Sequence, residues 1–234
     1  TKDNIIDKKI LPYFGKKSVN SITAADIRNW QNIMMSLRKK DGKPYSETYL
    51  HTINNQLTAI FNYAVKFYDL ANNPCRKAGS MGRKQADEMR FLTVDEFSKF
   101  IDGVMDKQKS YVTFMTLFWT GMRLGEMLAL TPADIDFENK TIRIDKSYDT
   151  KHKTEGPTKT YTSTRTITAP EFLLADIKDY MNSVYGLKKN DRLFGVTKYY
   201  MEHEKERALK NSGLDHVRIH DLRHSHCALL FEMG

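Results

Sequence analysis

Two short segments, far apart in the chain, combine arginine with histidine or glutamate. The first, Thr120–Glu126, has the sequence TGMRLGE and places Arg123 two residues after Gly121. Glycine frees the backbone at a turn, so Arg123 can project from the start of a helix. Glu126 follows one helical turn later and can orient the arginine. Taken alone, such a pair is more often a surface ion pair on a helix than a site.

The second segment, HDLRH, places His220 and Arg223 three residues apart, on one face if the segment is helical. This face would offer a proton carrier and a planar, two-pronged phosphate ligand. His220 and His224 also have a zinc-like spacing, and His226 follows. However, the zincin pattern needs glutamate directly after the first histidine, where Asp221 stands. We therefore expect neither a metal nor a cofactor.

Two arginines, a histidine and a loop lysine together suit transfer at a phosphodiester. The in-line transition state spreads negative charge over the nonbridging oxygens, which arginine forks stabilise without a metal. A lysine can then act as general acid for the leaving 5′ oxygen, provided that neighbouring positive charge lowers its pKa. The candidate lysines are Lys151, Lys153 and Lys159.

The elements that must position these groups are mostly helices in the second part of the chain. Thr93 followed by Glu96 is a capping box that predicts a helix start. Apolar periodicity predicts further helices over about 110–119, 123–130, 171–184, 198–210 and 221–233. Two alternating runs, Thr141–Ile144 and Arg165–Thr168, predict a β-hairpin with a long loop that carries the three lysines.

The first part of the chain predicts amphipathic helices. Residues 21–40 carry an apolar stripe, with Ser21 or Thr23 as the N-cap and Arg38, Lys39 and Lys40 in the last turn before residues 41–42. A second helix is expected after Ser46, ending before 72–74.

Residues 75–90 lack apolar periodicity and are polar and basic, which is typical of a linker. We predict a helical domain over 1–80, a basic linker over 81–90 and a second domain over 91–234. The whole is mainly α with a small antiparallel β-sheet. A linker of this charge can lie along a DNA backbone, so we expect DNA contacts from Arg76, Lys77, Arg83 and Lys84, and from Lys151 and Lys153 in the hairpin.

The distribution of charge points to a polyanion. The chain has 37 Lys and Arg against 29 Asp and Glu, a formal net charge of +8. Residues 1–80 hold 13 basic and 6 acidic side chains, whereas residues 81–234 hold 24 and 23. Each Lys or Arg placed on a phosphate releases condensed counterions. Charge alone leaves a basic surface without a partner equally open.

The sequence also excludes some classes of protein. A hydrophobic content of 40% can fill a globular core, but no run of about 18 apolar residues occurs, so no membrane span is expected. The first ten residues lack the apolar region of a secretory signal. Cys75 and Cys227 have no companion spacing for a disulfide framework or a zinc site. We therefore expect a cytoplasmic protein.

These segments together resemble the tyrosine recombinase (phage integrase) family. TGMRLGE, followed by LAL and DID, is similar to the first conserved box. PTKTYTSTRTI, residues 157–167, resembles the family's β-hairpin, and IHDLRHSH, residues 219–226, its second box. The order and spacing fit over essentially the whole chain, closest in style to integrases of phages and integrating conjugative elements.

The resemblance implies a helical core-binding domain followed by a catalytic domain. It implies that Arg123 and Arg223 clamp the phosphate, that His220 is their hydrogen-bonding or proton-transfer partner, and that Lys159 is the general acid. Lys151 and Lys153 remain rivals for that lysine, because hairpin loops vary in length. Glu126 matches the family's acidic residue that helps hold the active site together.

The resemblance further implies site-specific strand exchange on double-stranded DNA, through a 3′-phosphotyrosyl link, for integration and excision of a mobile element. A dimer on one DNA site and a tetramer in the synaptic complex are implied as well. In this family the nucleophilic tyrosine follows the second box by a few dozen residues. The present sequence has no tyrosine after Tyr200, so we expect the nucleophile to lie beyond it and this fragment alone to be inactive in cleavage.

Two other functions remain open. A type IB topoisomerase shares related chemistry but relaxes DNA without synapsis, and it would act as a monomer without sequence-specific binding. A DNA-binding regulator would keep the fold and lose catalysis, although the presence of both arginines, the lysine and the histidine argues against this.

Overall fold

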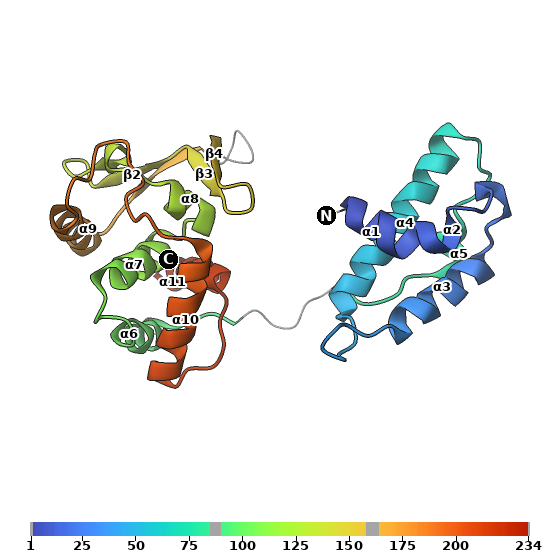
Figure 1. The fold of residues 1–234 in the computed structure, drawn as a ribbon, viewed down its shortest axis with the longest axis horizontal. Helices are drawn as coiled ribbons and strands as arrows, with labels where there is room; N and C mark the ends of the chain where they lie inside the picture. Colours follow the sequence, from blue (N-terminus) through green and yellow to red (C-terminus); the bar gives the residue numbers. More distant parts are fainter. Residues whose placement is uncertain (1, 85–89, 158–163, 234) are drawn as a thin grey trace. The chain divides into compact units, whose positions relative to one another are not determined.

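The computed structural model describes residues 2–84, 90–157 and 164–233. Lys159, one of the predicted catalytic residues, lies outside these ranges. The chain divides into two compact units, Thr1–Glu88 and Met89–Gly234, drawn in blue to cyan and in green to red in Figure 1. Each unit has its own buried apolar core.

The first unit is helical throughout its regular structure. Its N-terminal stretch is a single run of α1, a π-helical turn and α2, followed by the longer helices α3 and α4 and the short α5 (Figure 1). The bounds are α1 Lys2–Ile5, η1 Ile6–Ile10, α2 Leu11–Phe14, η2 Val19–Ser21, α3 Ala24–Ser36, α4 Glu47–Phe67 and α5 Pro74–Ala78.

Helix starts in this unit follow the predicted capping residues. Thr23 caps α3, and its side chain accepts a hydrogen bond from the backbone N–H of Asp26. The Asp26 carboxylate in turn accepts a hydrogen bond from the backbone N–H of Thr23. Ser46 caps α4. Three residues of the predicted apolar stripe, Ile27, Trp30 and Met34, are buried, whereas Leu37 lies beyond α3 and is partly buried. The indole of Trp30 donates to the carbonyl of Lys9 at 2.8 Å. The stripe therefore joins α3 to the N-terminal helical run.

The predicted C-terminal turn of α3 is wrong. The helix ends at Ser36, because Leu37 takes an extended conformation and the chain turns back at Gly42, which has a positive φ of 76°. Arg38 then bridges to Pro44, and Lys39 bonds to the carbonyl of Lys43. Arg38 still stabilises the helix end from outside, because its guanidinium donates to carbonyls of the last turn.

The stretch 75–90, whose composition is typical of a linker, is partly packed. Cys75, Ala78 and Met81 are buried in the core of the first unit, and the N–H of Arg83 donates to the carbonyl of Glu47. These apolar residues follow no helical stripe long enough to be recognised, because α5 has only five residues.

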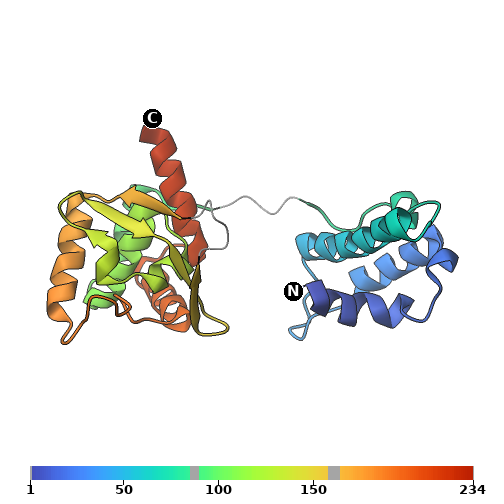
Figure 2. The same cartoon turned by 90° about the horizontal axis from the view of Figure 1, so that it is seen from above.

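The second unit surrounds the long, buried helix α7 and has a small sheet on one side (Figure 2). α7 packs against both α9 and α11, and its residues are buried on all faces, as expected of a central helix. The helices are α6 Val94–Asp102, α7 Gln108–Thr120, α8 Leu124–Ala129, the 3₁₀ turn η3 Pro132–Asp134, α9 Glu171–Ser183, α10 Lys198–Ser212 and α11 Ile219–Met233. These agree with the expected helices, including the capping box of Thr93 and Glu96.

The sheet contains the two predicted strands. The order β1-β2-β5 joins Ile135–Asp136, Thr141–Ile144 and Arg165–Thr168, all antiparallel, with Ile144 opposite Arg165. The expected hairpin of β2 and β5 is therefore confirmed. The stretch expected as a plain loop instead contains a second antiparallel pair, β3 Lys146–Asp149 and β4 Thr154–Pro157. The expected class, mainly α with a small antiparallel β-sheet, is confirmed.

No helix within the described ranges combines the length and the apolar character that crossing a membrane requires.

Candidate phosphodiester site

The turn between α7 and α8 presents Arg123. Gly121 ends α7 in the left-handed region with φ +59°, and a Cβ atom here would overlap the ring of His226. Arg123 then takes an extended conformation as the N-cap of α8. Its side chain is 51% exposed. The glycine thus meets both a conformational and a steric requirement, and the arginine emerges at a helix start as predicted.

Glu126 holds Arg123 in place. Its carboxylate accepts the backbone N–H of Arg123 at Oε2 and the Nη1 of the same arginine at Oε1, both at 2.9 Å. The side chain is 2% exposed. Burial alone would raise the pKa of Glu126, but hydrogen bonds from Arg165 and Arg123 outweigh it, and the pKa lies below its usual value. The carboxylate is therefore ionised at neutral pH.

Arg165, the first residue of β5, binds the same carboxylate. Its Nη2 donates to Oε2 at 2.8 Å and its Nη1 to Oε1 at 3.2 Å. In the sequence, Arg165 is only a strand position. Its partner lies 39 residues away, so no local spacing indicates the contact.

Arg223 joins the second box to the first. It lies on α11, and its Nη1 donates to the carbonyl oxygen of Gly121. Gly121 is only two residues from Arg123, a reach of at most about 7 Å along the backbone. The structure thus brings the two predicted arginines to the same turn, although they come from segments a hundred residues apart in sequence.

His220 lies one turn before Arg223 on α11 and is exposed. Its ring meets that of His224 edge to face, with centroids 4.8 Å apart. Loss of hydration lowers the pKa of His220, and the neighbouring His224 and Arg223 lower it further. The ring is therefore neutral at pH 7 and able to accept a proton or a hydrogen bond.

A pocket of about 570 Å³ opens beside Arg123. It is bounded by the start of α8, by the β3–β4 hairpin and by the first residue of α10. The side chains relevant to an anion are those of Arg123, Ser147, Thr150, Thr154 and Lys198. This combination of cations and hydroxyl groups suits a charged, solvated group such as a phosphate.

The remaining predicted residues are exposed at other places. Lys151 and Lys153 lie in the turn between β3 and β4, and Lys153 has a positive φ of 56°. In the first unit, the last turn of α5 and the residues after it carry four exposed cations, namely Arg76, Lys77, Arg83 and Lys84. The DNA contacts assigned to all six stay predictions, as do the catalytic roles of Arg123, Lys159, His220 and Arg223.

No group of three or more His, Cys, Asp or Glu side chains arranged for a metal ion occurs in the part of the chain that the structure describes. His220 and His224 therefore have no third ligand of these types among the described residues.

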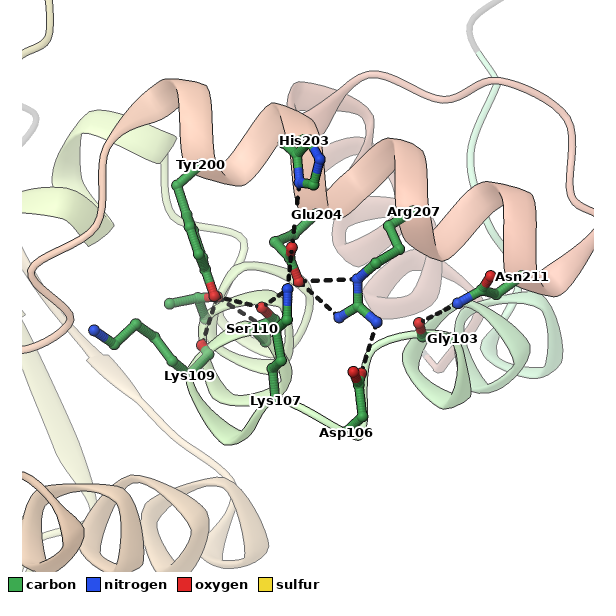
Figure 3. Close-up of polar contacts among 11 residues, drawn as sticks. Gly103, Asp106, Lys107, Lys109, Ser110, Tyr200, His203, Glu204, Arg207 and Asn211 are labelled. Carbon is green, nitrogen blue, oxygen red and sulfur yellow. Dashed lines mark hydrogen bonds and ion pairs between the residues drawn. The ribbon is translucent and has the colours of Figure 1, made fainter.

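A second polar cluster joins α10 to the α6–α7 connection (Figure 3). Glu204, 1% exposed, accepts hydrogen bonds from Lys107 at 2.9 Å, Ser110 at 2.8 Å and Arg207 at 2.6 Å. Arg207 also reaches Asp106 at 2.7 Å. Burial opposes ionisation, but these donors prevail and lower the pKa of Glu204 to about 2.

Comparison with known proteins assigns the chain to a family. Residues 90–234 match the phage integrase family, and residues 1–35 match the N-terminal SAM-like domain of phage integrases. The chain therefore belongs to the phage integrase family, which confirms the resemblance noted from its motifs.

Relatives and solved structures agree with this assignment. The ICEBs1 integrase of Bacillus subtilis (strain 168) is 30% identical over 98% of this chain and 65% of its own length. A XerC-like tyrosine recombinase of Caldanaerobacter subterraneus is 28% identical over 81% of this chain and 56% of its own length. The Tn1549 transposon integrase, solved with transposon right end DNA, shares the fold with a TM-score of 0.77 at 20% identity, over all of this chain and 80% of that one. The structure of a lambda integrase dimer bound to a core site gives a TM-score of 0.65 at 16% identity, over 99% of this chain and 82% of that one. The chain spans less than two thirds of the length of the two sequence relatives.

Proposed function

We propose that the protein containing this chain is a site-specific DNA recombinase that integrates and excises a mobile element. A tyrosine outside this sequence attacks a phosphodiester, forms a 3′-phosphotyrosyl link and frees a 5′ hydroxyl. A 5′ hydroxyl of the partner strand then reverses the step. The link conserves the energy of the phosphodiester, so this scheme requires no cofactor.

One observation carries the proposal: α11 is tied through Arg223 to the carbonyl of Gly121, beside the half-exposed Arg123. Two guanidinium groups near one turn can bind the nonbridging oxygens of a phosphate and stabilise the charge of the transition state. His220, neutral at pH 7, supplies a hydrogen bond or transfers a proton at the same phosphate.

The leaving 5′ oxygen needs a general acid, for which Lys159 is our first choice. In the sequence it follows Pro157 by two residues, and Pro157 lines the pocket beside Arg123. Lys151 and Lys153, in the turn of the β3–β4 hairpin, are the alternatives. Replacement of each lysine by alanine, with a substrate whose 5′ oxygen is replaced by sulfur, identifies the acid, because the better leaving group restores cleavage only to that variant.

The proposed partner is double-stranded DNA in the cytoplasm. The solved lambda integrase relative is a dimer on its core site, and we extend this to a dimer on one DNA site and a tetramer in the synaptic complex. The six exposed cations, Arg76, Lys77, Arg83, Lys84, Lys151 and Lys153, contact the DNA backbone and make its binding dependent on salt.

A nicked suicide duplex carrying the end of the mobile element tests the proposal. It is incubated with this chain and with the protein extended beyond Gly234, and covalent adducts are separated on a denaturing gel. An adduct with the extended protein alone supports the proposal. DNA binding without an adduct in either case favours a DNA-binding regulator, and an adduct with the present chain places the nucleophile within residues 1–234.

A further inference from the structure

The carboxylate of Glu126 lies between two arginines from different parts of the second unit. Arg123 precedes α8, whereas Arg165 begins β5. Glu126 is almost fully buried, at 2% exposure, while the side chains of Arg123 and Arg165 are 51% and 27% exposed. The arrangement places a buried anion behind two cations that both reach toward solvent.

The hydrogen bonds give the two arginines different roles. Arg165 contacts both carboxylate oxygens through its two terminal nitrogens, at 2.8 and 3.2 Å, in a forked geometry that fixes the carboxylate's plane. Arg123 contacts one oxygen through its side chain and the other through its backbone N–H. The orientation that Arg165 gives to the carboxylate is therefore passed to the guanidinium of Arg123.

The charges are unequal. Among the described residues, the two guanidinium groups form ion pairs with the single carboxylate of Glu126, so these three groups together carry one positive charge next to the pocket that Arg123 lines. A phosphate that binds to Arg123 thus completes the charge balance. If Arg165 were absent, Glu126 would neutralise Arg123 alone, and that surplus would be lost.

We propose that Arg165 is a positioning residue for DNA strand cleavage, acting through Glu126 on Arg123. It orients the Glu126 carboxylate and supplies the charge that frees Arg123 to bind phosphate. This role rests on the proposed recombinase function. Residues that orient metal ligands from behind change activity by about 10-fold to 100-fold, and we expect an effect of the same order for Arg165.

The test uses the protein extended beyond Gly234 and a nicked suicide duplex carrying the end of the mobile element. Single-turnover adduct formation is measured across a pH series, and DNA affinity is measured by gel shift. The variants are Arg165→Gln and Arg165→Lys. Arg143→Gln is the matched control, because Arg143 lies on the adjacent strand β2, opposite Thr166, and pairs with Asp134 and Asp145 instead of Glu126.

We expect Arg165→Gln to slow adduct formation by about 10-fold to 100-fold with little change in DNA affinity. The acid limb of its pH–rate profile should move to higher pH, because Glu126 then loses a cation that keeps its pKa low. Arg165→Lys should recover part of the rate, since an ammonium keeps the charge but not the fork. Arg143→Gln should match the unmodified protein.

The outcomes separate the two proposals. If the unmodified protein forms no adduct, the recombinase function fails, and the role of Arg165 fails with it. If it forms the adduct and Arg165→Gln is equally fast, or loses cleavage only in proportion to lost DNA binding, the positioning role alone is overturned. Should Arg165→Gln not fold, Arg165→Lys decides: a slower rate at unchanged affinity supports the role, and an unchanged rate overturns it.

Discussion

Two buried carboxylates in the second unit, Glu126 and Glu204, have similar partners but different surroundings. Each is almost fully buried and forms ion pairs with basic side chains from two segments. Around Glu204, Lys107 and Arg207 are balanced by Glu204 itself and by Asp106 (Figure 3). Around Glu126, two arginines face a single carboxylate, and Arg223 reaches the same turn.

The difference separates a structural cluster from a candidate site. The ion pairs of Lys107 and Arg207 with Glu204 and Asp106 join α10 to the α6–α7 connection and leave no surplus of positive charge among these four groups. A set with surplus positive charge next to a pocket attracts an anion. Burial and hydrogen bonding of a carboxylate therefore do not identify a site by themselves, whereas the net charge of its cluster and a pocket beside it do.

The largest expected effect comes from removing an arginine fork on the Glu126 side. Arg223→Lys should slow adduct formation by the extended protein by about 100-fold to 1,000-fold, because the single ammonium of lysine lacks the planar fork whose separate nitrogens can contact the Gly121 carbonyl and a phosphate oxygen together. Arg207→Lys, in the Glu204 cluster, is the matched control and should leave the rate unchanged. Equal losses in the two variants would remove the distinction between the clusters.

The next effect concerns stability. Glu204→Gln should destabilise the second unit by about 1.5–3 kcal/mol, since charge-assisted bonds to Lys107, Ser110 and Arg207 become weaker or are lost. Hydrogen exchange of the α10 backbone amides measures the loss locally. Adduct formation at moderate temperature should not change. A slower cleavage step in a folded Glu204→Gln protein would show that this cluster also serves the reaction.

A smaller effect tests how closely α11 approaches the α7–α8 turn. Gly121→Ala imposes a positive φ on alanine, at about 1–2 kcal/mol, and also drives a Cβ into the ring of His226. Gly213→Ala imposes the same strain at φ +68°, but no atom lies within 4 Å of its added Cβ. Urea unfolding should show a greater loss for Gly121→Ala, and cleavage should fall only there. Equal losses of stability and of cleavage in the two variants would mean that the His226 ring moves aside without displacing Arg223.

The sequence predicted those parts of the site that depend on local spacing. Arg123 at a helix start and Glu126 one turn later are an i, i+3 relation, and the capping box of Thr93 and Glu96 is equally local. The two contacts that assemble the site are not local. Arg165 meets Glu126 across 39 residues and Arg223 meets Gly121 across 102, so only tertiary packing reveals them.

The errors in the fold lie where the local sequence carries no clear signal of the element. The strands β3 and β4 were missed because most of their residues are polar and none is fully buried, which removes the alternation that identifies a strand. The end of α3 was placed too late because its stop is made by a turn at 37–44 and not by a residue directly after Ser36. Helix starts were placed well because capping side chains mark them in the sequence.

The smallest effect, and the last way to separate the two carboxylates, is acid unfolding. The pKa of Glu204 is lowered to about 2 in the folded protein, against an ordinary value of 4.5 for glutamate. Its contribution to stability is therefore complete above about pH 4.5 and is lost as the pH falls toward 2. Glu204→Gln should flatten the pH dependence of urea unfolding in this window, while its pH profile for adduct formation should coincide with that of the unmodified protein. A shifted cleavage profile would mean that protonation of Glu204 reaches the arginines, and the two clusters would then be one electrostatic unit.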